Sequence, residues 1–364
     1  MLKHADSVNL IERQAVGHLR ELLDEVLAIV IENIEVEIAG PGGVVDAVAH
    51  LDTGDRKHIL VCKVKAVGQP RHVRMAVLQL KEYVAQFVRR GEANATPVFI
   101  APYLSPEARA LCKEYGVGYL DFEGNCRLVF EGVFIERSVP SKPKAEQRDL
   151  KSLFKPKAAR VLRKMLRDPD RAWRVAELAE AAGVSLGHVS NVRKGLLDKE
   201  WAADAEEGTF LKDPEALLDS WREQYEPPAG KRTGFYTTLH GSALEEAMRE
   251  ALAHTNEKGA AMLASFSAAK WLAPYARTGS AYLYVDEDSV AALEDSLKLA
   301  PASKGENVFI TRLKDPGLFD DRSEPVPGIF CTCPVQTYLD LSAAGERGRE
   351  AAEHLRRELL SWHK

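Results

Sequence analysis

Two short polar segments that contain proline divide this sequence into three parts. The first, Val139–Arg148, is charged and poor in apolar residues, which favours a linker. The second, Tyr225–Arg232, has adjacent prolines and a glycine, and these end any helix that arrives from Trp221. The chain has 364 residues, so each part is long enough to bury a core of its own. We therefore expect domains over residues 1–139, 140–228 and 229–364.

The first and third parts alternate between helical and strand patterns. In the first part, strand patterns cover 35–38, 44–51, 59–64, 97–101, 118–120 and 127–134, and helical patterns cover 10–27, 71–89 and 106–115. Turns are expected at Gly40–Gly43 and Thr53–Asp55. In the third part, strand patterns cover 235–239, 281–285, 308–313 and 329–332, and helical patterns cover 242–255, 261–271, 289–297, 334–341 and 348–362. This alternation predicts a multidomain α/β (α+β) protein, with a mixed sheet in the first part and a second α/β domain at the C-terminus.

The overall composition excludes binding to nucleic acid through general basicity. Lys plus Arg number 49 against 54 Asp plus Glu, which gives a net charge of −5. The five cysteines are odd in number and scattered, which favours a reducing cytoplasm over a disulfide framework. Cys331 and Cys333 are expected on alternate faces of a strand, because no His or Cys follows them at zinc spacing. No apolar run approaches the ~18 residues of a membrane span, so we expect no membrane contact.

The strongest motif lies in the middle part. Val175–Ala182 is alanine-rich and predicts a short helix, and Gly183 suits its left-handed C-cap. Ser185 can cap a second helix over Leu186–Leu197. This order is typical of a helix-turn-helix whose second helix reads DNA. That helix turns outward small, polar and basic residues suited to base edges and phosphates: Ser185, Gly187, His188, Ser190, Asn191, Arg193 and Lys194.

The region around this motif is basic, although the whole chain is acidic. From Pro140 to Glu200 there are fifteen Lys or Arg and eight Asp or Glu. The helical pattern Lys151–Leu166 contributes Lys155, Lys157, Arg160, Arg163 and Lys164. A small hairpin over Trp201–Leu211 completes a winged helix, although Asp204, Glu206 and Glu207 within it would repel phosphate. The alternatives are a plain helical bundle with a basic surface and a module that binds protein.

The first part resembles the PD-(D/E)XK superfamily of restriction-endonuclease-like nucleases. Those enzymes pair an Asp on one strand with a Glu or Asp two residues before a Lys on the next, and the carboxylates hold Mg²⁺. Asp46 matches the first carboxylate and Lys65 matches the lysine. Lys63 occupies the position of the second carboxylate, and a lysine cannot ligate Mg²⁺ at neutral pH. Gln79 opens a pattern similar to the Gln-x-x-x-Tyr of many relatives.

We therefore expect a nuclease-like fold with a decayed catalytic site, which binds DNA or protein and needs no metal or other cofactor. Further carboxylates and basic residues of this part could lie near the site or contact phosphate: Glu21, Glu25, Glu35, Glu37, Arg71, His72 and Arg74. The alternative function is an Mg²⁺-dependent DNA endonuclease targeted by the winged helix. In that case Asp46, Lys65 and Gln79 are its catalytic residues.

Several segments outside these motifs carry a second resemblance: Gly116–Asn125, Ala264–Leu272, Pro334–Leu341 and Gly345–Ala352. With the helix-turn-helix, they make the chain similar to the long form of AbiEi-type antitoxins, transcriptional regulators of type IV toxin–antitoxin (abortive infection) systems. In that family an N-terminal winged helix binds operator DNA, and the paired toxin is a nucleotidyltransferase that is countered without a stable complex. This chain departs from the family by placing its helix-turn-helix in the middle.

The resemblance implies a cytoplasmic, autoregulating antitoxin that binds double-stranded operator DNA and pairs functionally with a nucleotidyltransferase toxin. A homodimer is one expected assembly, because winged-helix regulators often bind inverted repeats as dimers. A scaffold for other proteins, without contact to nucleic acid, is the third hypothesis.

Overall fold

The computed structural model describes residues 2–40, 43–54, 56–91, 94–140, 143–256, 260–275, 279–302 and 304–362. The chain forms two compact units, one of Met1–Gln147 with Leu197–Glu200 and one of Arg148–Leu196 with Trp201–Lys364. The division into three domains, with boundaries near residues 139 and 228, stays a prediction. Three residues of the turns expected at 40–43 and 53–55, Pro41, Gly42 and Asp55, lie outside the described residues.

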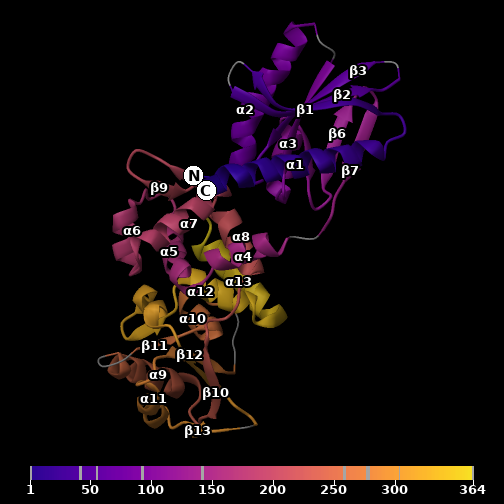
Figure 1. Ribbon diagram of the computed structural model, residues 1–364. Coiled ribbons are helices and arrows are strands. Elements are labelled where there is room, and N and C mark those ends of the chain that lie inside the picture. The colour runs from indigo at the N-terminus through magenta and orange to yellow at the C-terminus, as the bar shows by residue number, and fades with distance from the viewer. Residues whose placement is uncertain are drawn as a thin grey trace. The chain divides into compact units, whose positions relative to one another are not determined.

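The first unit is built on one seven-stranded sheet with the strand order β1-β2-β3-β4-β5-β6-β7. Figure 1 labels β1, β2, β3, β6 and β7 of this sheet, together with α1, α2 and α3. Its elements are α1 (Leu2–Asp24), β1 (Val30–Gly40), β2 (Gly43–Asp52), β3 (Lys57–Val64), α2 (Pro70–Arg89), β4 (Asn94–Ala101), α3 (Pro106–Glu114), β5 (Gly118–Asp121), β6 (Cys126–Phe130) and β7 (Val133–Arg137). β1, β2 and β3 are antiparallel, β3, β4 and β5 are parallel, and β5, β6 and β7 are again antiparallel. The expected mixed sheet is therefore confirmed.

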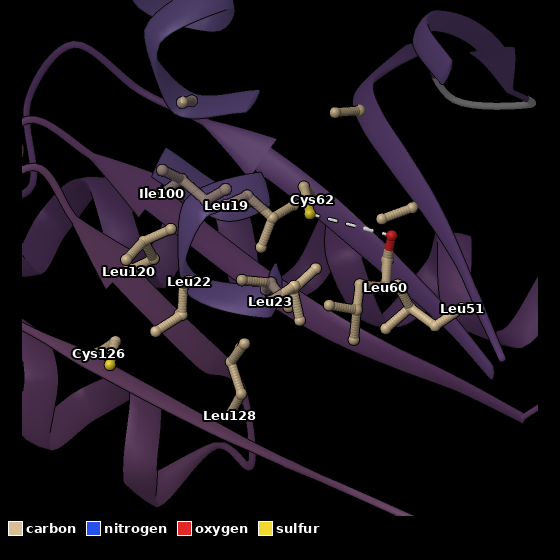
Figure 2. Close-up of a cluster of buried hydrophobic side chains, with 14 of the residues drawn as sticks. Leu19, Leu22, Leu23, Leu51, Leu60, Cys62, Ile100, Leu120, Cys126 and Leu128 are labelled. Atoms are coloured by element: carbon tan, nitrogen blue, oxygen red, sulfur yellow. Dashed lines mark hydrogen bonds between the residues drawn. The ribbon is translucent and has the colours of Figure 1, made fainter. Parts of the chain in front are cut away.

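Helices cover both faces of this sheet and create two apolar cores. On one face, Leu19, Leu22 and Leu23 of α1 pack against Leu60 and Ile100 of the central strands, as Figure 2 shows. On the other face, α2 and α3 bury side chains against the same strands. Because β3 lies between two covered faces, every residue after Lys57 in that strand is buried.

One strand expected in this unit is instead a hairpin. The pattern over 127–134 contains β6 and β7, which pair as antiparallel neighbours. Glu131 and Gly132 connect them with φ angles of 42° and 80°. Two successive positive φ angles are typical of the tight turns that match the twist of paired strands. The prediction missed this turn because apolar residues continue on both sides of it.

The second unit contains a helical region followed by a second seven-stranded mixed sheet, with the order β13-β10-β14-β12-β11-β16-β15. The helical region has α4 (Lys144–Leu153), α5 (Pro156–Arg167), α6 (Val175–Ala182), α7 (Leu186–Asp198), the hairpin β8 (Ala202–Asp204) and β9 (Thr209–Leu211), and α8 (Pro214–Glu223). α4 begins and α7 ends in residues that belong to the first unit. These elements agree with the helices and hairpin expected over 175–211.

The strands and helices of the second sheet region alternate as expected. They are β10 (Gly230–Tyr236), α9 (Gly241–Thr255), β11 (Ala261–Leu263), α10 (Ser265–Leu272), β12 (Ala281–Val285), α11 (Val290–Ser296), β13 (Ala300–Pro301), β14 (Val308–Leu313), a 3₁₀ helix η1 (Pro316–Asp321), β15 (Ser323–Val326), β16 (Ile329–Cys331), α12 (Pro334–Ser342) and α13 (Gly345–Leu359). The α/β class is thus confirmed for this region too.

Four local predictions were wrong. The linker expected over Val139–Arg148 contains the start of α4, and the helix expected over Lys151–Leu166 is split into α4 and α5, since Pro156 starts a new helix. The helix expected over 261–271 begins with strand β11, because three apolar residues there are buried in the sheet. Cys333 lies at the N-cap of α12 and not on the strand of Cys331.

All five cysteines are buried and free, in agreement with the absence of a disulfide framework. Within the part of the chain that the structure describes, no helix has the length and apolar character needed to cross a lipid bilayer.

Candidate nucleic-acid interface

The turn between α6 and α7 forms as its sequence requires. Gly183 closes α6 in the left-handed conformation, with φ 61° and ψ 40°, which glycine adopts without strain. At the start of α7, the amide of His188 donates to the Ser185 hydroxyl over 3.4 Å. The imidazole Nδ1 of His188 lies 3.0 Å from the same oxygen. The predicted C-cap and N-cap are therefore both present.

One face of α7 is buried and the opposite face is open to solvent. Val189, Val192 and Leu196 are buried against the unit's core. Six of the seven residues expected to contact DNA are exposed: Ser185, Gly187, His188, Ser190, Asn191 and Lys194. Since α7 makes one turn per 3.6 residues, these positions share the solvent-facing side of the helix and its N-terminal end, together with the exposed Leu186.

Arg193, the seventh predicted contact, is held by the hairpin. Its Nη2 donates to Asp204 Oδ2 over 2.6 Å, and its Nε donates to Thr209 Oγ1 over 2.8 Å. The side chain is only half-exposed. Asp204, which would repel phosphate as part of a wing, thus neutralises this arginine, and Arg193 fixes the hairpin to α7.

Most of the cations on α5 also have acidic partners. Arg163, Lys164 and Arg167 all form ion pairs with Asp321 of η1, and Arg160 pairs with Asp315. Lys155 and Lys157, in contrast, are exposed. The positive excess counted along the sequence therefore overstates the charge available to a ligand. The acidic partners of these cations lie some 150 residues later in the chain, outside the segment that was counted.

Lys157 lies close to the exposed face of α7. Together with Gly183, Ser185 and His188 it lines an open hollow of ≈ 430 Å³ beside the turn. Glu180 lines the same hollow. An ammonium group, a hydroxyl and the N-terminus of a 13-residue helix thus converge there, which is an arrangement that suits a phosphate group.

In the first unit, the residues that match the nuclease pattern form an internal ion pair. The Nζ of Lys63 donates to Asp46 Oδ1 over 2.8 Å and to the carbonyl of Val44 over 3.0 Å. The other carboxylate oxygen of Asp46 accepts from the amide of Val64 over 2.6 Å. Both side chains are buried to about nine-tenths. The ammonium group of Lys63 therefore neutralises the carboxylate to which a divalent cation would bind.

Sequence analysis missed one carboxylate near this pair, because it lies on the first helix. Burial raises the pKa of Glu12 on α1, and the negative charges of Asp46 and Glu37 raise it further. The positive charges of Lys63 and Lys65 act in the opposite direction. Glu12 thus interacts electrostatically with Asp46 and Glu37, and the helical periodicity of α1 is the signal that could have placed Glu12.

The remaining residues named for this site lie elsewhere: Gln79 is exposed on α2, Glu21 is exposed on α1, Glu25 pairs with Arg137, and Glu35 lies 3.5 Å from His50. Among the residues that the structure describes, no group of three or more His, Cys, Asp or Glu is arranged to hold a metal ion. The site thus combines carboxylates with a lysine.

The basic residues expected at the start of α2 differ in their environments. Arg74 donates to both carboxylate oxygens of Glu200, over 2.8 and 3.0 Å, and to the hydroxyl of Tyr115. Burial lowers the pKa of His72. Arg71 is exposed. Of these three, Arg71 is the exposed cation best placed to meet an approaching phosphate, because Arg74 is held by Glu200 and burial disfavours the charged form of His72.

The comparison with known families concerns the C-terminal part of the chain. Residues 211–361 match a family model. Its description is "Transcriptional regulator, AbiEi antitoxin, Type IV TA system". The match covers less than half of the chain and begins at the last residue of β9, so it contains the second sheet but neither α6 nor α7. The C-terminal part is therefore similar to AbiEi antitoxin regulators. No curated protein matches the chain.

Two solved structures are similar to part of the chain. One is titled "Structure of EndoMS-dsDNA2 complex", with 26% identity over 29% of this chain and 44% of that chain, and a TM-score of 0.21. The other is a "crystal structure of a repair endonuclease from Pyrococcus abyssi", with 21% identity over 29% of this chain and 46% of that chain, and a TM-score of 0.22. This chain thus spans less than half the length of either, and at these TM-scores the likeness carries no argument.

Proposed function

We propose that this protein is a DNA-binding transcriptional regulator whose helix α7 reads the major groove, within a winged helix-turn-helix formed by α5, α6, α7 and the β8–β9 hairpin. The observation that supports the proposal is the exposed polar face of α7. Ser190 and Asn191 are the candidates for base edges, because short polar side chains on a groove-binding helix can reach them. Lys194 and Lys157 are the candidates for phosphates.

The hairpin has a supporting role in this proposal. Its Asp204 neutralises Arg193, and the pair fixes the position of β8 relative to α7. Since a negatively charged wing is unsuited to phosphate, we assign recognition to α7 and assign positioning of that helix to the hairpin.

The regulator proposal extends to an antitoxin that represses its own promoter. Its support is the match of residues 211–361 to a family described as an antitoxin and transcriptional regulator. A toxin of the nucleotidyltransferase class, paired functionally with this chain, belongs to the same proposal, as does a homodimer on an inverted repeat. Growth rescue of cells that express the neighbouring toxin gene tests the antitoxin part separately from DNA binding.

The experiment for DNA binding is fluorescence anisotropy with the duplex upstream of the gene, over a series of salt concentrations. Lys194→Ala is expected to weaken binding to all sequences and to lower the salt slope by about 1. Asn191→Ala is expected to cost ~1–3 kcal/mol on the operator and little on unrelated DNA. Lys231→Ala, an exposed lysine of β10, is the matched control. Unchanged operator binding in both α7 variants would contradict the proposal.

For the first unit we propose a nuclease-like domain that does not cleave DNA and takes no metal. The support is the Lys63–Asp46 pair, because a fixed ammonium group next to the carboxylate repels a divalent cation. The test is plasmid cleavage by the purified protein with Mg²⁺ or Mn²⁺. Cleavage by the unaltered protein that is lost in Asp46→Asn would establish the alternative, an endonuclease that uses Asp46 and Lys65.

A further inference from the structure

A cavity of ≈ 720 Å³ opens between α9, α10 and the second sheet, away from the residues assigned to DNA. Its apolar lining comes from α9, β11, β16 and α10: Leu244, Met248, Leu263, Ile329, Phe266 and Trp271. Cavities of ~300–1,000 Å³ with apolar and aromatic walls are typical of sites for small molecules. The size and lining therefore favour one compact ligand with an apolar body.

Most polar groups on the wall already have partners within the fold. Ser267 Oγ accepts from the amide of Tyr282 over 2.9 Å. Asn307 Oδ1 accepts from the amide of Thr237 over 2.9 Å, and its Nδ2 donates to the carbonyl of Thr237 over 2.8 Å. A ligand cannot use these groups without breaking the hydrogen bonds that position the strands.

The lining of the cavity also includes one lysine and one glutamate, which contact each other directly. Lys270 on α10 pairs with Glu245 on α9. Their side chains are 52% and 44% exposed, so both are reachable from solvent. An exposed pair of this kind contributes little to stability, and exchange of partners costs correspondingly little. His240 and Tyr275 are the other titratable groups on the lining.

We propose that this cavity binds an α-amino acid with an aromatic side chain. The ligand's carboxylate pairs with Lys270 and its ammonium group pairs with Glu245, so neither protein charge loses a counterion. A ligand with only one charge can form only one of these two ion pairs, and the other protein group then keeps only water as its partner. The aromatic ring packs against Phe266 and Trp271, and the thioether of Met248 offers a further contact to its edge.

The proposal gives a role to a segment that the sequence singles out. Phe266, Ser267, Lys270 and Trp271 all lie on α10. The pairs 266/270 and 267/271 are four residues apart, which places them on one side of the helix. A single helical face therefore supplies the aromatic wall and the cation of the cavity.

The test is isothermal titration calorimetry of the full-length protein with L-phenylalanine and with two analogues, phenethylamine and 3-phenylpropionate, each of which lacks one charge. We expect the amino acid to bind, and we expect each analogue to bind with an affinity lower by ~10-fold or more. Lys270→Met and Glu245→Gln are each expected to weaken the amino acid ~10-fold. Arg312→Met, which opens the ion pair with Glu287 elsewhere in the same unit, is the matched control.

A second readout is the tryptophan emission of the protein, which L-phenylalanine does not obscure. We expect the ligand to change the emission of the unaltered protein, and we expect Trp271→Phe to abolish that change. No heat and no change in emission with L-phenylalanine would overturn the proposal, as would equal affinity for the three ligands or full affinity in Lys270→Met. Because no DNA is present, the result does not depend on the proposed role of α7.

Discussion

A single buried carboxyl group makes the stability of the second unit depend on pH. Asp340 lies on α12, and its Oδ1 accepts hydrogen bonds from the hydroxyls of Tyr225 and Tyr284 and from Gln336 Nε2. Burial raises its pKa from the ordinary 3.8 to about 6, because these three donors only partly replace the water that a charged carboxylate loses. At a pH between these two values, the folded state therefore keeps a proton on Asp340 that the unfolded chain has released.

The sign and size of the effect follow from the two pKa values. Between about pH 4 and pH 6 the folded state binds more protons than the unfolded state, so the free energy of unfolding falls as pH rises through this window. The total loss is ~3 kcal/mol, at about 1.36 kcal/mol for each pH unit between the two values. Above pH 6 the contribution is constant. Asp340→Asn removes it and keeps an oxygen that can accept from both tyrosines.

Urea unfolding followed by tryptophan fluorescence measures this difference selectively, because all five tryptophans lie in the second unit. Relative to the unaltered protein, Asp340→Asn is expected to gain ~3 kcal/mol of stability between pH 4 and pH 7. Glu353→Gln, with a 55% exposed side chain, is the control and should show no such gain. A difference between Asp340→Asn and the unaltered protein that stays constant over this pH range would refute the assignment of the raised pKa.

Three further changes test other parts of the structure. Asp321→Ala leaves Arg163, 3% exposed, without its buried counterion and should cost ~3–5 kcal/mol in the same urea assay; a loss below 1 kcal/mol would contradict the buried pair. Gly183→Ala forces a side chain into a left-handed conformation and should cost ~1 kcal/mol by the same measurement, whereas no loss would show that the turn relaxes. Lys63→Ala leaves Asp46 buried without a cation and should lower the melting temperature of the first unit by circular dichroism, an effect that Lys63→Ala with Asp46→Asn should partly reverse.

Elements with a clear period could be predicted from the sequence almost to the residue. The helix expected at Val175–Ala182 and the strands expected at 281–285 and 308–313 have those bounds in the structure. Errors arose where one apolar pattern continues through a change of direction, as at Glu131 and Gly132, or through a change from strand to helix near Ala264. Apolar periodicity does not mark such points unless a turn residue interrupts it.

The exposed face of α7 could be predicted because burial of Val189, Val192 and Leu196 follows from helical spacing alone. The ion pairs that the charged residues around this face form within the fold could not be predicted from the sequence. Arg193 faces outward by spacing, yet the ion pair that holds it depends on a hairpin eleven residues later. Asp321, which pairs with three cations of α5, is separated from them by more than 150 residues.

Charge counted along a sequence is therefore an upper limit on the charge that a ligand meets. In this protein, α5 uses most of its cations to join the helical region to η1, and its exposed lysines are those at the start of the helix. The same reasoning applies to the residues proposed to form a nuclease-like site, where Lys63 pairs with Asp46. Contact with DNA, as proposed, must then depend on the hydrogen-bonding groups of α7 and a few lysines beside it, and discrimination between sequences should contribute more than general attraction to phosphate.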